Sequence, residues 1–162
     1  MSKAAELANL IGNINAGGGG VNRNVIINGA MNVAQRGTSS TGIGASTGYF
    51  TCDRFVIATD SSNATAGRLT MTQDSSAPSG FANSLKLACT TADTSIASDE
   101  QLRINTRIEG QNLQSFAKGT SDAKPFAVSF YVKGNASATY VCELYDNTLF
   151  INMCLPDVCV CC

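Results

Sequence analysis

Residues 24–37, NVIINGAMNVAQRG, carry the strongest local signal in the chain. An aliphatic run leads to Asn28 and Gly29, and the alternation of apolar and polar residues then resumes. An Asn-Gly pair between two apolar runs favours a β-hairpin, because both residues tolerate the positive φ that a tight turn requires. We therefore expect a hairpin centred on Asn28 and Gly29. Gln35 and Arg36 are expected to fix the exit from its second strand and not to contact a ligand.

Further segments have the composition of short strands separated by Gly, Ser, Asn, Asp and Pro. The expected strands cover residues 51–58, 68–73, 84–89, 101–109, 126–133 and 138–145, of which 126–133 is the most strand-like. Residues 37–48 and 74–80 read as polar loops, and 112–116 as a short helical turn. Many short strands with frequent turns favour an all-β sandwich or barrel.

The two ends of the chain differ from its middle. Residues 1–14 predict a short amphipathic helix, and residues 15–23 a glycine-rich linker. Residues 24–146 would form the β domain, and residues 147–162 an atypical tail dense in Cys. We interpret this tail as the product of a shifted reading frame, which would leave the β domain incomplete. A natural hydrophobic tail is the alternative.

Composition narrows the classes of function. The 162 residues carry a net charge of −1, so they give no electrostatic signature of nucleic-acid binding. His is absent, which removes the commonest general base and the commonest metal ligand. No apolar run approaches the length of a membrane span, and the N-terminus lacks the continuous apolar core of a signal peptide. We expect a protein made in a reducing cytoplasm, with no membrane insertion.

The sequence has 7 Cys residues in two groups. Cys52, Cys89 and Cys142 lie far apart and are expected to be buried free thiols. The others crowd into residues 154–162 without the Cys-x-x-Cys spacing of a zinc knuckle, so no metal site is expected. No cofactor is expected either. A calcium site built from acidic side chains is the alternative, and it would use Asp93, Asp99, Glu100 and Asp146.

Several motifs occur together in a fixed order. The opening segment NVIINGAMNVAQRG is followed by TCDRF at 51–55, RIEG at 107–110 and FAVSFYVKG at 126–134. Together they resemble the bacteriophage tail-fibre-like virion proteins with carbohydrate-binding-module-like β-sandwich domains. The resemblance runs from about Ser2 to about Asp146 and implies a jelly-roll-like β-sandwich. It implies a virion protein made in the host bacterial cytoplasm, which forms a homo-oligomer such as a trimer or binds other virion proteins.

The resemblance also implies contact with host surface polysaccharide without catalysis. Sugar sites in such modules use aromatic rings together with polar side chains. The aromatic candidates are Tyr49, Tyr131, Tyr140 and Tyr145, with Phe50 and Phe81 also considered, and packing in the core is the alternative for each. Arg54, Arg107 and Glu109 lie in the motifs and are expected to tether strands and loops rather than bind ligand.

Two other functions remain open. One is a purely structural tail or capsid decoration protein with no ligand. The other is a polysaccharide depolymerase, for which sequence spacing nominates no pair of catalytic carboxylates.

Overall fold

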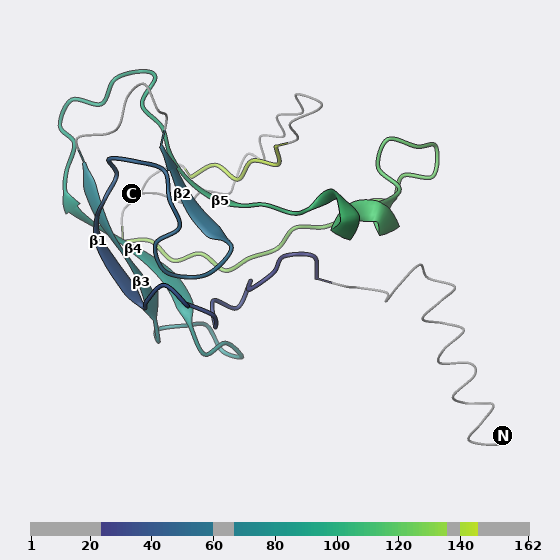
Figure 1. Cartoon of the computed structure of the whole chain (residues 1–162), viewed down its shortest axis with the longest axis horizontal. Coiled ribbons are helices and arrows are strands. Elements are labelled where there is room, and N and C mark those ends of the chain that lie inside the picture. The colour runs from purple at the N-terminus through teal and green to yellow at the C-terminus, as the bar shows by residue number, and fades with distance from the viewer. Residues whose placement is uncertain (1–23, 60–66, 136–139, 146–162) are drawn as a thin grey trace.

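The computed structural model describes residues 24–59, 67–135 and 140–145; the expected N-terminal helix, linker and Cys-rich tail lie outside these ranges. The described chain forms five strands and one 3-10 helix (Figure 1). Their bounds are β1 Ser39–Ile43, β2 Phe55–Thr59, β3 Arg68–Asp74, β4 Ser84–Thr91, β5 Leu102–Thr106 and η1 Gly110–Phe116. One antiparallel sheet has the order β1-β3-β4, and the other consists of β2 and β5. The described part is therefore all-β, with little helix.

The alternation along β3 decides which side chains face the core. Leu69 and Met71 are buried, whereas Thr70 between them is half-buried. Met71 lies opposite Leu87 of β4. The predictions of β3, β4, β5 and the helical turn are confirmed, with shifts of one to a few residues at their ends.

Strand β1 forms where the sequence predicts a loop. It pairs antiparallel with β3, and the register shifts between Ser40 and Ile43. Gly42 lies inside this irregularity with a φ of +70°, a value that suits glycine at a bulge. The prediction of a loop over 37–48 is wrong at these residues. A five-residue strand with a bulge shows little alternation of apolar and polar residues in its sequence.

Strand β2 is enclosed, and all its residues are buried. On one side it pairs with β5, where Ile57 lies opposite Ile104. On the other side Gly48 exchanges two backbone hydrogen bonds with Ile57, at 2.9 and 3.0 Å. The Thr47 hydroxyl accepts a hydrogen bond from the Thr59 N–H at 2.9 Å and donates to the Thr59 carbonyl at 3.0 Å. These contacts satisfy backbone groups that an open edge would leave unpaired.

A single hydrophobic cluster contains residues from both sheets. Its buried members are Ile43, Cys52, Phe55, Ile57, Leu69 and Met71. Burial raises the pKa of the Cys52 thiol, which agrees with its role as a small apolar side chain in the core. Cys89 and Cys142 are also free thiols, but Cys89 is exposed and Cys142 only half-buried, so the expectation of burial is right for Cys52 alone.

The predicted Asn28-Gly29 hairpin does not form. A turn is present, but its backbone hydrogen bond runs from the Met31 N–H to the Asn28 carbonyl at 2.9 Å, and no strand flanks it. The central residues are thus Gly29 and Ala30. The Asn28 amide itself binds both backbone groups of Val33, which a partner strand would otherwise use. This local bonding between side chain and backbone replaces the hairpin ladder.

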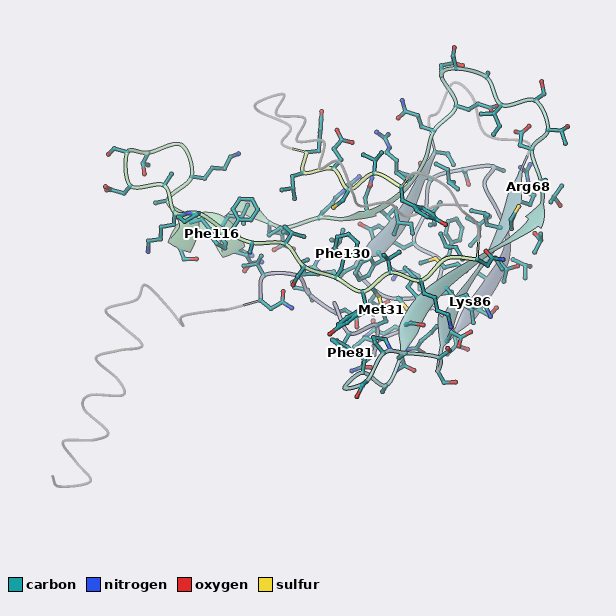
Figure 2. All side chains as sticks on the ribbon, turned by 180° about the vertical axis from the view of Figure 1, so that it is seen from behind. Met31, Arg68, Phe81, Lys86, Phe116 and Phe130 are labelled. Atoms are coloured by element: carbon teal, nitrogen blue, oxygen red, sulfur yellow. The ribbon has the colours of Figure 1, made fainter. Side chains whose placement is uncertain are left out.

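The predicted strand at 126–133 is also wrong. The segment runs from η1 back towards the sheets but belongs to none of the ladders in the described chain (Figures 1 and 2). Its alternate apolar residues are exposed: Phe126 by 59%, Val128 by 38%, Phe130 by 43% and Val132 by 53%. Residues 140–145 form no strand either, and 138–139 lie outside the described ranges. Alternating apolar and polar residues indicate that a segment suits a pleated sheet. A ladder of backbone hydrogen bonds also requires a neighbouring strand in register.

Candidate functional site

A pocket of about 260 Å³ lies where three loops meet. Gln35 and Arg36 come from the turn before β1, Tyr49 from the segment that covers the edge of β2, and Asp53 and Arg54 from the turn before β2. The lining residues therefore come from three separate stretches of the chain. They combine an aromatic ring with positive, negative and amide groups.

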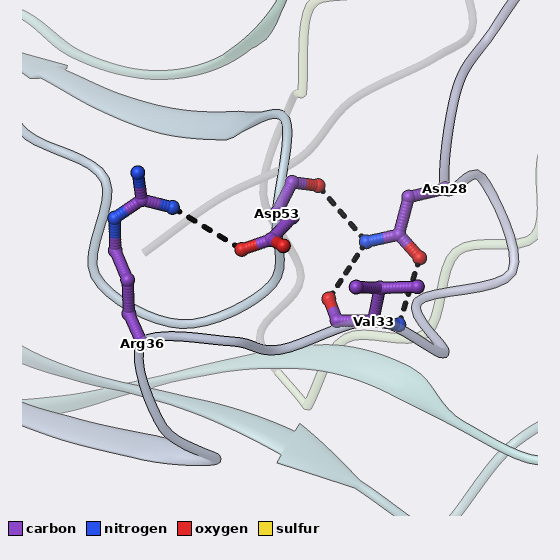
Figure 3. A network of polar contacts seen from close by, with 4 residues as sticks. All are labelled: Asn28, Val33, Arg36 and Asp53. Atoms are coloured by element: carbon purple, nitrogen blue, oxygen red, sulfur yellow. Dashed lines mark hydrogen bonds and ion pairs between the residues drawn. The ribbon is translucent and has the colours of Figure 1, made fainter.

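The amide of Asn28 holds two of these loops together (Figure 3). Its Oδ1 accepts from the Val33 N–H, and its Nδ2 donates to the carbonyls of Val33 and Asp53, each at 2.9 Å. The Val33 carbonyl also accepts from the Asp53 N–H at 2.9 Å. Asn28 adopts a φ of +60°, which Asn tolerates better than most residues. This network positions Asp53 beside the turn that carries Arg36.

Arg36 contacts two other lining residues. Its Nη1 lies 3.1 Å from Oδ1 of Asp53. Its guanidinium carbon lies 5.4 Å from the centre of the Tyr49 ring, within the range of a cation–π contact. The Asp53 side chain is only 16% exposed, while that of Arg36 is 52% exposed. The carboxylate is therefore set back and the guanidinium faces solvent.

Arg54 links the pocket to the chain after β5. Its Nη2 lies 2.9 Å from Oε1 of Glu109, and Gln111 donates to the other carboxylate oxygen at 2.8 Å. The pKa of Glu109 is lowered, mainly by the hydrogen bond from Arg54. The hydrogen bond from Gln111 and the positive charge of Arg54 lower it further. Arg54 has a φ of +74°, a left-handed conformation within the turn at residues 51–54, and this turn explains why β2 starts later than predicted.

The chemistry of the pocket suits recognition of a polar ligand. Guanidinium and amide N–H groups can donate to ligand oxygens, Asp53 can accept from hydroxyls, and Tyr49 offers ring surface and a hydroxyl. The five lining residues include one carboxylate, whereas retaining and inverting glycosidases usually use two that flank the scissile bond. The lining thus offers donors, acceptors and a ring to a polar ligand.

The predicted tyrosines do not gather at one place. Tyr49 lines the pocket and is 40% exposed. Tyr131 is 74% exposed and packs edge-to-face on Phe81, with 5.8 Å between ring centres. Tyr140 is half-buried, and Tyr145 is 61% exposed. Of the four, only Tyr49 is among the residues that line this pocket.

The motif residues also differ in position. Asn28 braces the pocket, Gly29 lies in the turn beside it, and Arg54 lines it. Glu109 holds Arg54 from outside, while Arg107 is exposed on the short stretch after β5.

The sequence prediction missed Gln35, Arg36 and Asp53 as pocket residues. All three belong to short motifs, QRG at 35–37 and TCDRF at 51–55. Charged and amide side chains in such turn segments are the sequence feature that could have indicated a site.

A second pocket of about 350 Å³ borders η1. It is lined by Gly110, Leu113, Gln114, Ala117 and Lys118. All five belong to one short helical segment and its end, so this pocket does not bring separate parts of the chain together. We therefore take the first pocket as the candidate site.

The described ranges contain no metal-binding cluster and no membrane-spanning helix. Within them, no group of three or more His, Cys, Asp or Glu is placed to hold a metal. Among the expected calcium ligands, Asp93 accepts from the Ser95 N–H and Glu100 from the Ala97 N–H, and Asp146 is not among the described residues. The described helix is too short and too polar to cross a membrane.

Comparison of the chain with protein-family models, with curated proteins and with solved structures gives no match to any of them.

Proposed function

We propose that this protein is a non-catalytic component of a bacteriophage virion that contacts host surface glycans, as a tail fibre or receptor-binding protein. The observation that carries the proposal is the pocket, where Tyr49 lies beside Arg36 and Asp53. A ring that offers apolar surface, next to charged and amide groups that can bind hydroxyls, is the usual composition of a sugar site. The motifs that resemble tail-fibre-like proteins support the same assignment.

For the fold, we propose a jelly-roll-like β-sandwich. Two antiparallel sheets that contribute to one hydrophobic cluster support this architecture. The expected partners are further copies of the chain, in a trimer or another homo-oligomer, and other virion proteins. Several copies would convert a weak single site into useful avidity.

The test is glycan binding by the full chain, displayed in several copies on streptavidin, against an array of bacterial surface polysaccharides. Tyr49→Ala should weaken binding by about tenfold, or ~1.4 kcal/mol, because it removes the ring from the pocket. Tyr131→Ala is the matched control, since Tyr131 is exposed but does not line the pocket. Binding that is insensitive to Tyr49, or absent from every glycan, would contradict the proposal.

A purely structural virion role is the second candidate, and the exposed row of Phe126, Val128, Phe130 and Val132 favours it. Exposed apolar rows of this kind are common where one protein packs on another. Incorporation into the virion together with silence on the glycan array would support this role in place of glycan binding.

A further inference from the structure

The pocket presents more hydrogen-bond donors than acceptors. Arg36 and Arg54 each carry five N–H groups in a planar fork. Arg36 forms its ion pair through Nη1 and Arg54 through Nη2, each with a single carboxylate oxygen. A monodentate ion pair of this kind leaves other N–H groups of the fork available to a ligand. Neither guanidinium is locked in a bidentate contact by its protein partner.

The residues that line the pocket carry a net positive charge. Two guanidiniums and one carboxylate line it, and that carboxylate, Asp53, is 16% exposed. Glu109, which neutralises Arg54, is not a lining residue. Glu109 lies beside the pocket and is 45% exposed, so the excess of positive charge belongs to the lining residues themselves. The chain as a whole has a net charge of −1, so this positive character is local.

The ring of Tyr49 adds a geometric limit. The Arg36 guanidinium lies over one face of it at 5.4 Å. A sugar that also contacts Arg36 then meets the edge of the ring and its hydroxyl, because the guanidinium covers the face on that side. A ligand that packs against this edge and carries an anionic group reaching Arg36 or Arg54 would use the ring and the donors together.

From these observations we infer that the pocket selects acidic glycans, with the carboxylate of a uronic acid residue bound by Arg36 and Arg54 and the sugar ring against Tyr49. The inference rests on the proposed glycan-binding function. Carboxylates are the anions whose planar geometry matches the guanidinium fork. A nucleic acid is a poorer fit, because it requires a broad basic surface and not two arginines in a small pocket.

The experiment compares polygalacturonate with its carboxyl-reduced counterpart, which has the same chain without the negative charge. Binding of the full protein is measured by biolayer interferometry at 50 mM and 500 mM NaCl. We expect a preference of about tenfold or more for polygalacturonate at low salt, reduced at high salt because exposed charges are screened.

Three variants assign the preference to the pocket. Arg36→Gln and Arg54→Gln should each abolish most of it, whereas Arg36→Lys retains the charge and should keep part of it. Arg103→Gln is the control, because it removes the same charge outside the pocket. Arg103 lies on β5 opposite Ala58 and is not a lining residue. Circular dichroism spectra that match the parent protein show that each variant is folded.

The outcomes separate this inference from the proposed function. Equal binding of both polymers would overturn the acidic selectivity and leave glycan binding in place. Equal binding of dextran sulfate would show general anion attraction and would also overturn the assignment of a carboxylate. Absence of binding to every polysaccharide on the array would overturn both the inference and the function on which it rests.

Discussion

The Asn28 amide joins two loops that contribute residues to the pocket. Its three hydrogen bonds reach the backbone of Val33 and of Asp53. The bond to the Asp53 carbonyl is half-buried and the two to Val33 are exposed, and a hydrogen bond of this type contributes about 1 kcal/mol to stability. Because the contacts are to backbone, they fix the path of the loops whatever side chains Val33 and Asp53 carry.

Replacing Asn28 should therefore destabilise the protein. Asn28→Ala loses the amide and places Ala at a φ of +60°, and we expect a loss of about 2–3 kcal/mol in the free energy of unfolding, measured with urea. Asn28→Gly loses the same hydrogen bonds but tolerates this φ, so it should be less destabilising than Ala. Equal stability of Asn28→Ala and the parent protein would show that the brace is dispensable.

The ion pair of Arg54 and Glu109 has a measurable signature in pH. Because the folded state lowers the pKa of Glu109 below its ordinary 4.5, the ionised carboxylate favours folding. This contribution is fully present above the unfolded pKa and is lost as the pH falls through the folded pKa. In NMR titration the Glu109 carboxyl should have a midpoint below 4.5, and Arg54→Gln should raise it. A midpoint unchanged by Arg54→Gln would show that the pair does not persist in solution.

At the scale of elements, β3 and β4 are the strands whose bounds the sequence predicts best. Strands β3 and β4 are joined by the predicted turn at 74–80 and pair residue for residue from Leu69 with Cys89 to Asp74 with Ser84. The two failures have different physical origins. Residues 126–133 suit a strand but have no ladder within the described chain, and Asn28 prefers its side-chain bonds to a hairpin.

The candidate site is harder to predict than the strands. Tyr49 and Arg54 are recognisable from residue type and motif, but Gln35, Arg36 and Asp53 matter because three loops converge. Sequence separation hides that convergence, since the Asn28 contact to Asp53 spans 25 residues. The residue types in each loop show which polar groups it carries. They do not show which loops lie together in the folded chain.

The inner face of β3 allows a direct test of the core. Met71 is fully buried at the centre of the cluster shared by both sheets. Met71→Ala should lower the free energy of unfolding by about 2–5 kcal/mol, through lost burial and the cavity that remains. Thr70→Ala, on the half-buried face of the same strand, should change it by less than about 1 kcal/mol. Similar effects of the two substitutions in urea unfolding would contradict the assignment of faces.

At the scale of the whole molecule, the core of the described chain is only partly covered. Leu85, Leu87, Leu102 and Ile104 pack on the buried cluster but remain half-buried themselves. The apolar row at 126–132 is more exposed still. Both features leave apolar surface in contact with water, which is unfavourable for an isolated copy and favourable for association.

We therefore expect the protein to self-associate through residues 126–132, with a second copy covering the apolar row. An unpaired extended segment of high β-propensity can bind another segment like itself. In sedimentation velocity the average mass should rise with protein concentration, and Phe130→Lys should shift it towards the monomer, because a charge then interrupts the row. Ser129→Lys adds the same charge at the neighbouring position without removing an apolar side chain of the row, so it should have a smaller effect. A parent protein that stays monomeric at all concentrations, or two variants that behave alike, would show that this row does not mediate association.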